Sequence, residues 1–210
     1  MSSLDLFAKI SSFVETHLLE TGKEQVASPM GPKYVFEHSL RVAFWCWHLA
    51  LEMHADVSTC VAAGLFHDVS HFELKKNETQ KVSAQTARGF MEKEGFKKEF
   101  MDTVAGAIES QAQVRMLKTL EAKILHDADK IDEFGYFRLL LFTRMTEESF
   151  PKLRENAKFL LAEVEKLENG EYGEMGTSMG KARIKTQITT YKAFLNGLLE
   201  EIEATETTMG

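Results

Sequence analysis

The chain is poor in the residues that crosslink or interrupt a fold. Its 210 residues include only two cysteines, three prolines and 13 glycines. Cys46 and Cys60 are too few for a disulfide framework and form no CxxC pair, so we expect two buried free thiols and no zinc–cysteine site. The scarcity of proline and glycine argues against long disordered segments.

The sequence also lacks a long apolar run and an excess of positive charge. No stretch approaches the roughly 18 apolar residues of a membrane-spanning helix. Residues 1–20 alternate charged and apolar side chains, unlike a secretory signal. A net charge of −7 suits neither nucleic-acid backbones nor anionic lipid. We therefore expect a cytoplasmic protein that binds neither a nucleic-acid polymer nor a membrane.

Apolar residues recur at helical spacing along almost the whole chain, which predicts an all-α fold. We expect helices around 7–18, over about 34–54, from 57 to 68, around 82–91 and 100–108, over 120–145, around 153–167 and over about 181–203. Segment 21–33 is predicted as a loop, and 169–180 as a glycine-rich surface loop. One domain is expected over 1–210, with a core at about 34–145 and a C-terminal helical extension at about 146–210. The amphipathic terminal helices could form a homodimer interface or cover the core.

Four side chains on the predicted helices have the chemistry of a metal site. His38 lies on one helix, His67 and Asp68 end the next, and Asp129 lies on the long helix over 120–145. Imidazole and carboxylate ligands together suit Mn, Fe, Ni, Co or Zn, and such a site can activate water near neutral pH. The alternative is that each is an ordinary core or surface residue, and spacing alone does not decide between the two.

Three segments carry a family resemblance: EHSLRVA, AAGLFHDV and DADKIDEFG, which contain these four residues in order. They resemble the HD-domain phosphohydrolase superfamily, and the tail, with its final FLNGLLEE, is similar to that of small bacterial stand-alone HD hydrolases. The resemblance implies an all-α HD bundle in which His38, His67, Asp68 and Asp129 bind one divalent ion (Mn, Fe, Ni, Co, Zn or Mg). It also implies metal-assisted hydrolysis of a phosphate ester or anhydride in a small phosphorylated molecule, often a nucleotide.

Three further residues are candidates for roles in that chemistry. His71 stands where the family often has Glu or Lys; it could transfer a proton beside Asp68, or merely cap the helix end. Arg41 and Lys130 could bind the substrate phosphate. For both cations the alternative is a salt bridge, with Glu37 and Asp127 respectively.

Three other polar residues lie near Asp129 in the sequence. Asp127 and Asp132 could support the metal ligands from behind or lie on the helix surface. We expect His126 to support the site or pack in the core rather than bind the metal.

The chain departs from the family pattern after His71. Residues 72–125 contain no histidine, and the segment where relatives often place one reads AIESQAQ. We therefore expect one metal rather than two. The departure also motivates an alternative function, a degenerate HD scaffold that binds metal and nucleotide for regulation. A metal-dependent oxygenase or lyase is a third alternative, but the ligands for a second iron are not visible.

Overall fold

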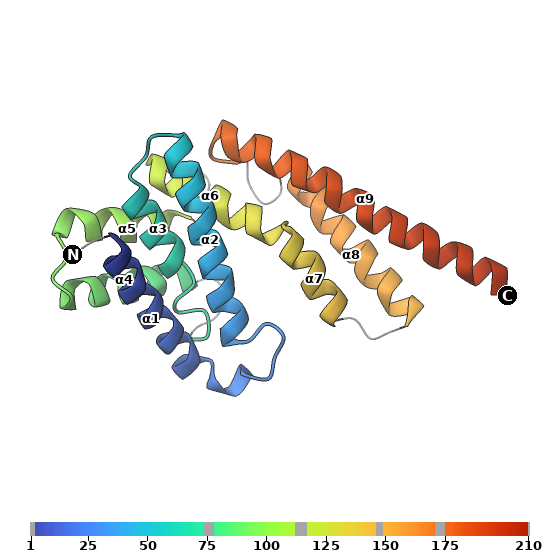
Figure 1. Cartoon of the computed structure of the whole chain (residues 1–210), viewed down its shortest axis with the longest axis horizontal. Coiled ribbons are helices and arrows are strands. Elements are labelled where there is room, and N and C mark those ends of the chain that lie inside the picture. The colour runs from blue at the N-terminus through green and yellow to red at the C-terminus, as the bar shows by residue number, and fades with distance from the viewer. Residues whose placement is uncertain (1–2, 74–77, 112–116, 146–148, 171–174, 210) are drawn as a thin grey trace.

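The computed structural model describes residues 3–73, 78–111, 117–145, 149–170 and 175–209, and within these ranges it is all-α, with no strand. The α-helices are α1 (Ser3–Thr21), α2 (Pro32–Glu52), α3 (Val57–Phe66), α4 (Thr79–Lys93), α5 (Lys98–Ser110), α6 (Leu120–Glu133), α7 (Tyr136–Met145), α8 (Phe150–Glu168) and α9 (Ser178–Met209), with a short 3-10 helix, η1 (Lys23–Gln25). Figure 1 shows α1 to α6 gathered in a bundle, from which α7, α8 and α9 extend to the far C-terminus. No helix among the described residues is long and apolar enough to cross a membrane.

Helix α3 forms the centre of the bundle because its sequence is apolar on every side. All of its residues from Thr59 to Phe66 are buried, as expected for a helix surrounded by others. Asp56 fixes where it begins, since its carboxylate accepts hydrogen bonds from the Ser58 and Thr59 amides at 3.0 and 3.3 Å. Helix α2 packs against α1, α3 and α6, so the helices that carry the predicted site are direct neighbours.

A glycine allows α2 and α3 to approach closely. A Cβ placed on Gly64 would lie 2.8 Å from Ala43 Cα on α2 and 3.1 Å from Cys46 Sγ. Cys46 is itself fully buried and, like Cys60, forms no disulfide. Both thiols are therefore core groups, as predicted, and the crossing at Gly64 sets the spacing of the two helices that carry His38 and precede His67.

The predicted helix over 120–145 is wrong, because the chain breaks into α6 and α7. Phe134 leaves the helical conformation with φ −107° and ψ 23°, and the Gly135 amide bonds back to the Asp132 carbonyl at 3.0 Å. The carbonyls of Ile131 and Asp132 would stand 3.1–3.2 Å from a Cβ on Gly135, so a larger residue would be crowded there. The apolar spacing continued across the break, and the glycine was the signal that a helix ended.

The predicted helix from 57 to 68 also ends early, at Phe66. The residues that follow form successive tight turns, in which the amides of Val69 and His71 bond to the carbonyls of Phe66 and Asp68 at 3.0 Å. These i to i+3 bonds bring Asp68 beside His71. His67 and His71 therefore do not lie on one regular helix.

The C-terminal helices are joined to the bundle through a buried carboxylate. Asp127 on α6 accepts hydrogen bonds from the Gly176 amide, the Thr177 amide and the Thr177 hydroxyl, at 2.6–2.9 Å. A Cβ on Gly180 would collide with this carboxylate. Thr177 and Gly180, in the last part of the predicted surface loop at 169–180, are therefore buried, and α9 begins three residues earlier than expected; residues 171–174 lie outside the described part of the chain.

The helix crossing predicts the effect of Gly64→Ala. The added methyl group must push α2 and α3 apart, and overpacking of this kind typically costs about 1–3 kcal/mol. The matched control is Gly89→Ala, at an exposed position inside α4 where a Cβ would meet nothing within 4 Å. Replacing a helical glycine there should instead stabilise by about 0.5–1 kcal/mol. Urea unfolding monitored by circular dichroism measures both; equal effects of the two substitutions would contradict the tight crossing.

Candidate metal centre

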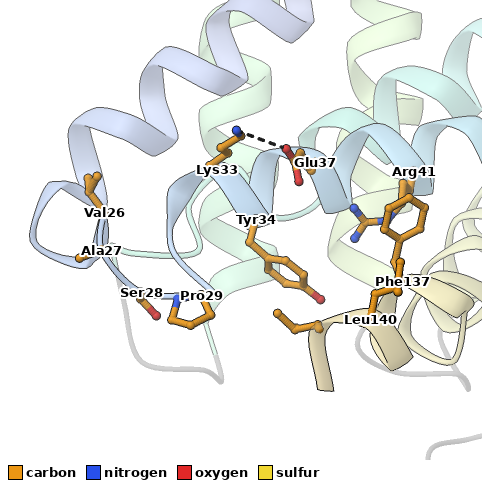
Figure 2. A pocket seen from close by; sticks show the side chains of 11 residues that line it. Val26, Ala27, Ser28, Pro29, Lys33, Tyr34, Glu37, Arg41, Phe137 and Leu140 are labelled. Atoms are coloured by element: carbon orange, nitrogen blue, oxygen red, sulfur yellow. Dashed lines mark ion pairs between the residues drawn. The ribbon is translucent and has the colours of Figure 1, made fainter. Parts of the chain in front are cut away.

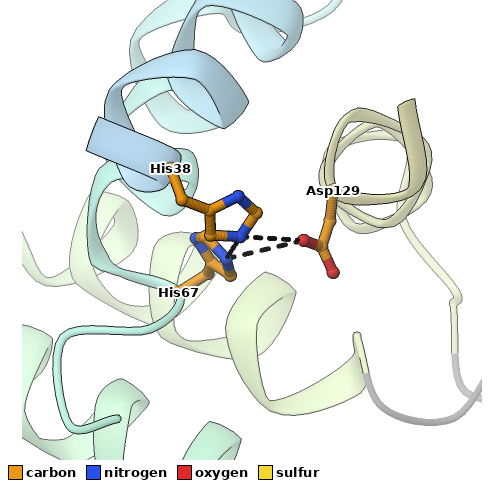
Figure 3. Close-up of side chains that lie close together, drawn as sticks. All are labelled: His38, His67 and Asp129. Carbon is orange, nitrogen blue, oxygen red and sulfur yellow. Dashed lines mark hydrogen bonds and ion pairs between the residues drawn. The ribbon is translucent and has the colours of Figure 1, made fainter. Parts of the chain in front are cut away.

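Three of the four predicted ligands meet at one point between α2, α3 and α6. One ligand atom from each of His38, His67 and Asp129 lies within 4.8 Å of the other two (Figure 3). The two Nε2 atoms are 3.2 Å apart, and Asp129 Oδ1 is 3.2 Å from His38 Nε2 and 3.7 Å from His67 Nε2. Within the described ranges, this is the sole group of three or more such residues with metal-binding spacing.

Hydrogen bonds behind the two imidazole rings orient them toward this point. His67 Nδ1 donates to the Gly64 carbonyl at 2.8 Å, and His38 Nδ1 donates to Asp132 Oδ2 at 2.7 Å. Each bond fixes the Nδ1 proton, so the Nε2 lone pair is the one available inside the cluster. Such partners on the far side of a ring are characteristic of metal-binding histidines.

The spacing of the three atoms fits a single divalent ion. Ligand atoms that lie about 2.1 Å from a common ion, at tetrahedral to octahedral angles, stand about 3.0–3.4 Å from one another. Two of the observed separations are 3.2 Å and the third, 3.7 Å, corresponds to a wider angle. Two nitrogens and a carboxylate oxygen form a donor set for Mn, Fe, Co, Ni or Zn.

The pKa values of His38 and Asp129 reflect how closely these polar atoms lie to one another. Burial lowers the pKa of His38, but hydrogen bonds to Asp129 and Asp132 outweigh it and raise that pKa well above 6.5. Burial likewise acts to raise the pKa of Asp129, and the His38 hydrogen bond with the charges of His67 and Lys130 brings it well below its usual value. Both shifts favour a positive charge at the point where the two rings and Asp129 meet.

Asp68, the fourth predicted ligand, lies at the edge of the cluster. Its Oδ2 is 3.8 Å from His67 Nε2 and 3.4 Å from His71 Nδ1. The pKa of Asp68 is lowered, because the nearby His67 charge and the His71 hydrogen bond outweigh its burial. The His71 side chain is 43% exposed and that of Asp68 is 20% exposed, so His71 is the more solvent-accessible member of the pair.

Arg41 and Asp132 form a support behind His38. Asp132 accepts from Arg41 Nε at 2.8 Å and from Arg41 Nη2 at 3.0 Å, a two-point contact in addition to its bond with His38. The burial of Asp132 removes the surface alternative for that residue. Arg41 is paired, but with Asp132 rather than with Glu37, whose carboxylate lies 4.0 Å from Lys33. These contacts place Arg41 on the Nδ1 side of His38, away from the cluster.

The second predicted cation, Lys130, lies on the same helix turn as Asp129. Its Nζ is 2.5 Å from Glu133 Oε2, so its near neighbour is Glu133 and not the predicted Asp127. Asp127 is fully buried and instead accepts hydrogen bonds from Thr177, just before α9. Lys130 is only 16% exposed in its side chain, and its charge contributes to the low pKa of Asp129.

One residue near the metal centre was missed by the sequence reasoning. Gln111, in the AIESQAQ segment, donates from Nε2 to Asp129 Oδ2 at 2.7 Å and leaves Oδ1 facing the histidines. Its own Oε1 is buried without a hydrogen-bond partner in the described structure. The sequence offered a signal for this position, since relatives often place a histidine in this segment. His126 is also buried, outside the cluster, and its Nε2 has no described partner.

Comparisons with known proteins agree with this arrangement. The family model described as HD domain matches residues 35–133. Among solved structures, a predicted HD superfamily hydrolase from an uncultured Thermotogales bacterium is 20% identical, with a TM-score of 0.64 over 96% of this chain and 99% of that one. An HD-superfamily hydrolase from Bacillus thuringiensis is 16% identical, with a TM-score of 0.63 over 97% and 100%.

At these identities the structural likeness establishes the fold. No curated protein matches the chain. The family match spans α2 to α6, the segment that brings both histidines and Asp129 to one point. Residues 35–133 of this chain therefore match the HD-domain family.

Proposed function

We propose that this protein is a metal-dependent hydrolase that cleaves a phosphate ester or anhydride in a small phosphorylated molecule, of which a nucleotide is one example. The observation that carries the proposal is the convergence of His38 Nε2, His67 Nε2 and Asp129 Oδ1 at separations that suit one ion. The HD-domain match supports a metal-dependent hydrolase in general, and the phosphate chemistry is the finer step.

A divalent ion held by these residues would lower the pKa of a bound water and polarise a phosphoryl oxygen. We propose Asp68 as the fourth ligand, since its Oδ2 lies 3.8 Å from His67 Nε2 and its carboxyl is ionised at neutral pH. His71 would transfer a proton between Asp68 and solvent, because its ring lies 3.4 Å from the Asp68 carboxylate and its side chain is 43% exposed.

The two cations take different roles in this proposal. Lys130 would bind the substrate phosphate as a point charge, since it is adjacent to Asp129 and its charge already acts on that carboxylate. Arg41, also predicted to bind phosphate, would act through Asp132 to hold the His38 ring. His38 and Asp132 lie between its guanidinium and the cluster.

The proposed activity predicts phosphate release that depends on the cluster. Purified protein is assayed against a panel of nucleotides and sugar phosphates with added Mn, Ni, Co or Mg. His67→Ala should abolish turnover, and Asp129→Asn, which keeps the shape of the side chain, should reduce it at least 100-fold. His48→Ala, on α2 but outside the cluster, is the control and should retain activity. Turnover that survives both cluster substitutions would refute the proposal, whereas tight nucleotide binding without release would favour the regulatory alternative.

The support behind His38 predicts the effect of Asp132→Asn on metal affinity. Loss of the carboxylate weakens the hold on His38 Nδ1 and on Arg41, and comparable changes cost about 10- to 100-fold in metal affinity. Titration of metal-free protein with Mn or Zn against a chelating dye measures the change without any assay of turnover. Glu37→Gln, an exposed acid on α2 beside His38, is the control. An unchanged metal dissociation constant in Asp132→Asn would show that the support is dispensable.

The raised pKa of His38 predicts opposite pH trends for metal-free and metal-loaded protein. Protonated His38 stabilises the metal-free fold below pH 6.5, and this contribution is lost as pH rises through the higher folded pKa. Metal binding requires the proton to leave, so metal affinity should increase with pH across the same window. Thermal unfolding between pH 6 and 9, with and without metal, tests both trends. They should be absent in His38→Gln, and an identical pH slope in wild type and variant would contradict the assignment.

A further inference from the structure

A cavity lies beside Arg41, outside the metal centre. It has a volume of about 560 Å³ and is lined by residues of 26–29, the first half of α2 and α7 (Figure 2). Pockets for small organic ligands typically measure about 300–1,000 Å³. Its lining includes no residue of the cluster formed by His38, His67 and Asp129.

The walls of this cavity are largely apolar and more exposed than such side chains usually are. Val26 is 62% exposed and Phe137 is 55% exposed, and Leu140 lines the same wall. In Figure 2 the Tyr34 ring extends from α2 into the space between residues 26–29 and Leu140. Single exposed apolar residues are ordinary, but here residues from separate elements face one concave space.

The cationic group of the cavity is Arg41, held between two aromatic rings. Its guanidinium carbon lies 4.5 Å from the Phe137 ring centroid and 5.7 Å from that of Tyr34. Asp132 engages Nε and Nη2, while Nη1 has no hydrogen-bond partner in the described part of the chain. At the rim, Lys33 and Glu37 stand 4.0 Å apart and offset one another. The Nη1 edge is therefore the position where an anionic group would be recognised.

We propose that this cavity binds a small organic anion with a flat apolar body, such as an aromatic carboxylate, sulfonate or phosphate. The anionic group accepts hydrogen bonds from Arg41 Nη1, and the body packs against Tyr34, Phe137 and Leu140. The ligand is separate from the reacting phosphate, because the two nitrogens of His38 face opposite ways. Nε2 faces the cluster, whereas Nδ1 faces Asp132 and, beyond it, Arg41.

The test uses 8-anilinonaphthalene-1-sulfonate, a fluorescent aromatic sulfonate, with the metal-free full-length protein. Binding should be saturable with one site per chain. Phe137→Ala should weaken it at least tenfold by removing one wall, and Arg41→Lys should do the same by removing the Nη1 edge. Phe159→Ala, at an equally exposed phenylalanine on α8, and Trp47→Ala, at an exposed position on α2, are the controls and should leave the affinity within twofold.

Two outcomes would overturn the proposal. One is that the probe does not bind, or that the control substitutions weaken its binding as much as Phe137→Ala does. The other is a change of oligomeric state in Phe137→Ala, measured by light scattering, which would make the surface a subunit interface. Neither readout requires metal or turnover, so failure here is distinguishable from failure of the proposed hydrolase activity.

Discussion

Two imidazole nitrogens and a carboxylate oxygen face one another across about 3–4 Å inside this bundle, and the rest of the site follows from how they are held. Three lone-pair donors at such distances repel unless a proton or a cation lies among them. The Gly64 carbonyl and Asp132 fix the outer nitrogens of the two rings, so neither histidine can turn its Nε2 away without losing a hydrogen bond. In the absence of metal, the hydrogen bonds from His38 to Asp129 and Asp132 raise the pKa of His38 despite its burial.

Helix α6 connects this constraint to the remainder of the chain. Its three aspartates point in different directions: Asp129 into the cluster, Asp132 toward His38 and Arg41, and Asp127 toward the residues that begin α9. A shift of α6 would therefore disturb the metal centre and the C-terminal helices together. Burial raises the pKa of Asp127 even though Thr177 and Gly176 donate to it, which shows how far this contact lies from solvent.

The sequence predicted the all-α fold and the residues that meet, because helical periodicity and the short motifs around His38, His67 and Asp129 are local signals. It did not predict the break at Gly135, since apolar spacing continues through it. It also extended the helix that begins at Val57 to Asp68, whereas that helix ends at Phe66 and tight turns follow. Gln111 and the pairing of Arg41 with Asp132 depend on which helices pack together, and a single sequence carries little of that information.

The central claim is that His38, His67 and Asp129 hold one divalent ion. Anomalous X-ray scattering from crystals grown with Mn or Zn, collected at the absorption edge of the metal, tests it directly. The account predicts one strong anomalous peak per chain, about 2.1 Å from each Nε2 and from Asp129 Oδ1. A cluster without a peak in metal-containing crystals, or with its histidines turned apart, would contradict it.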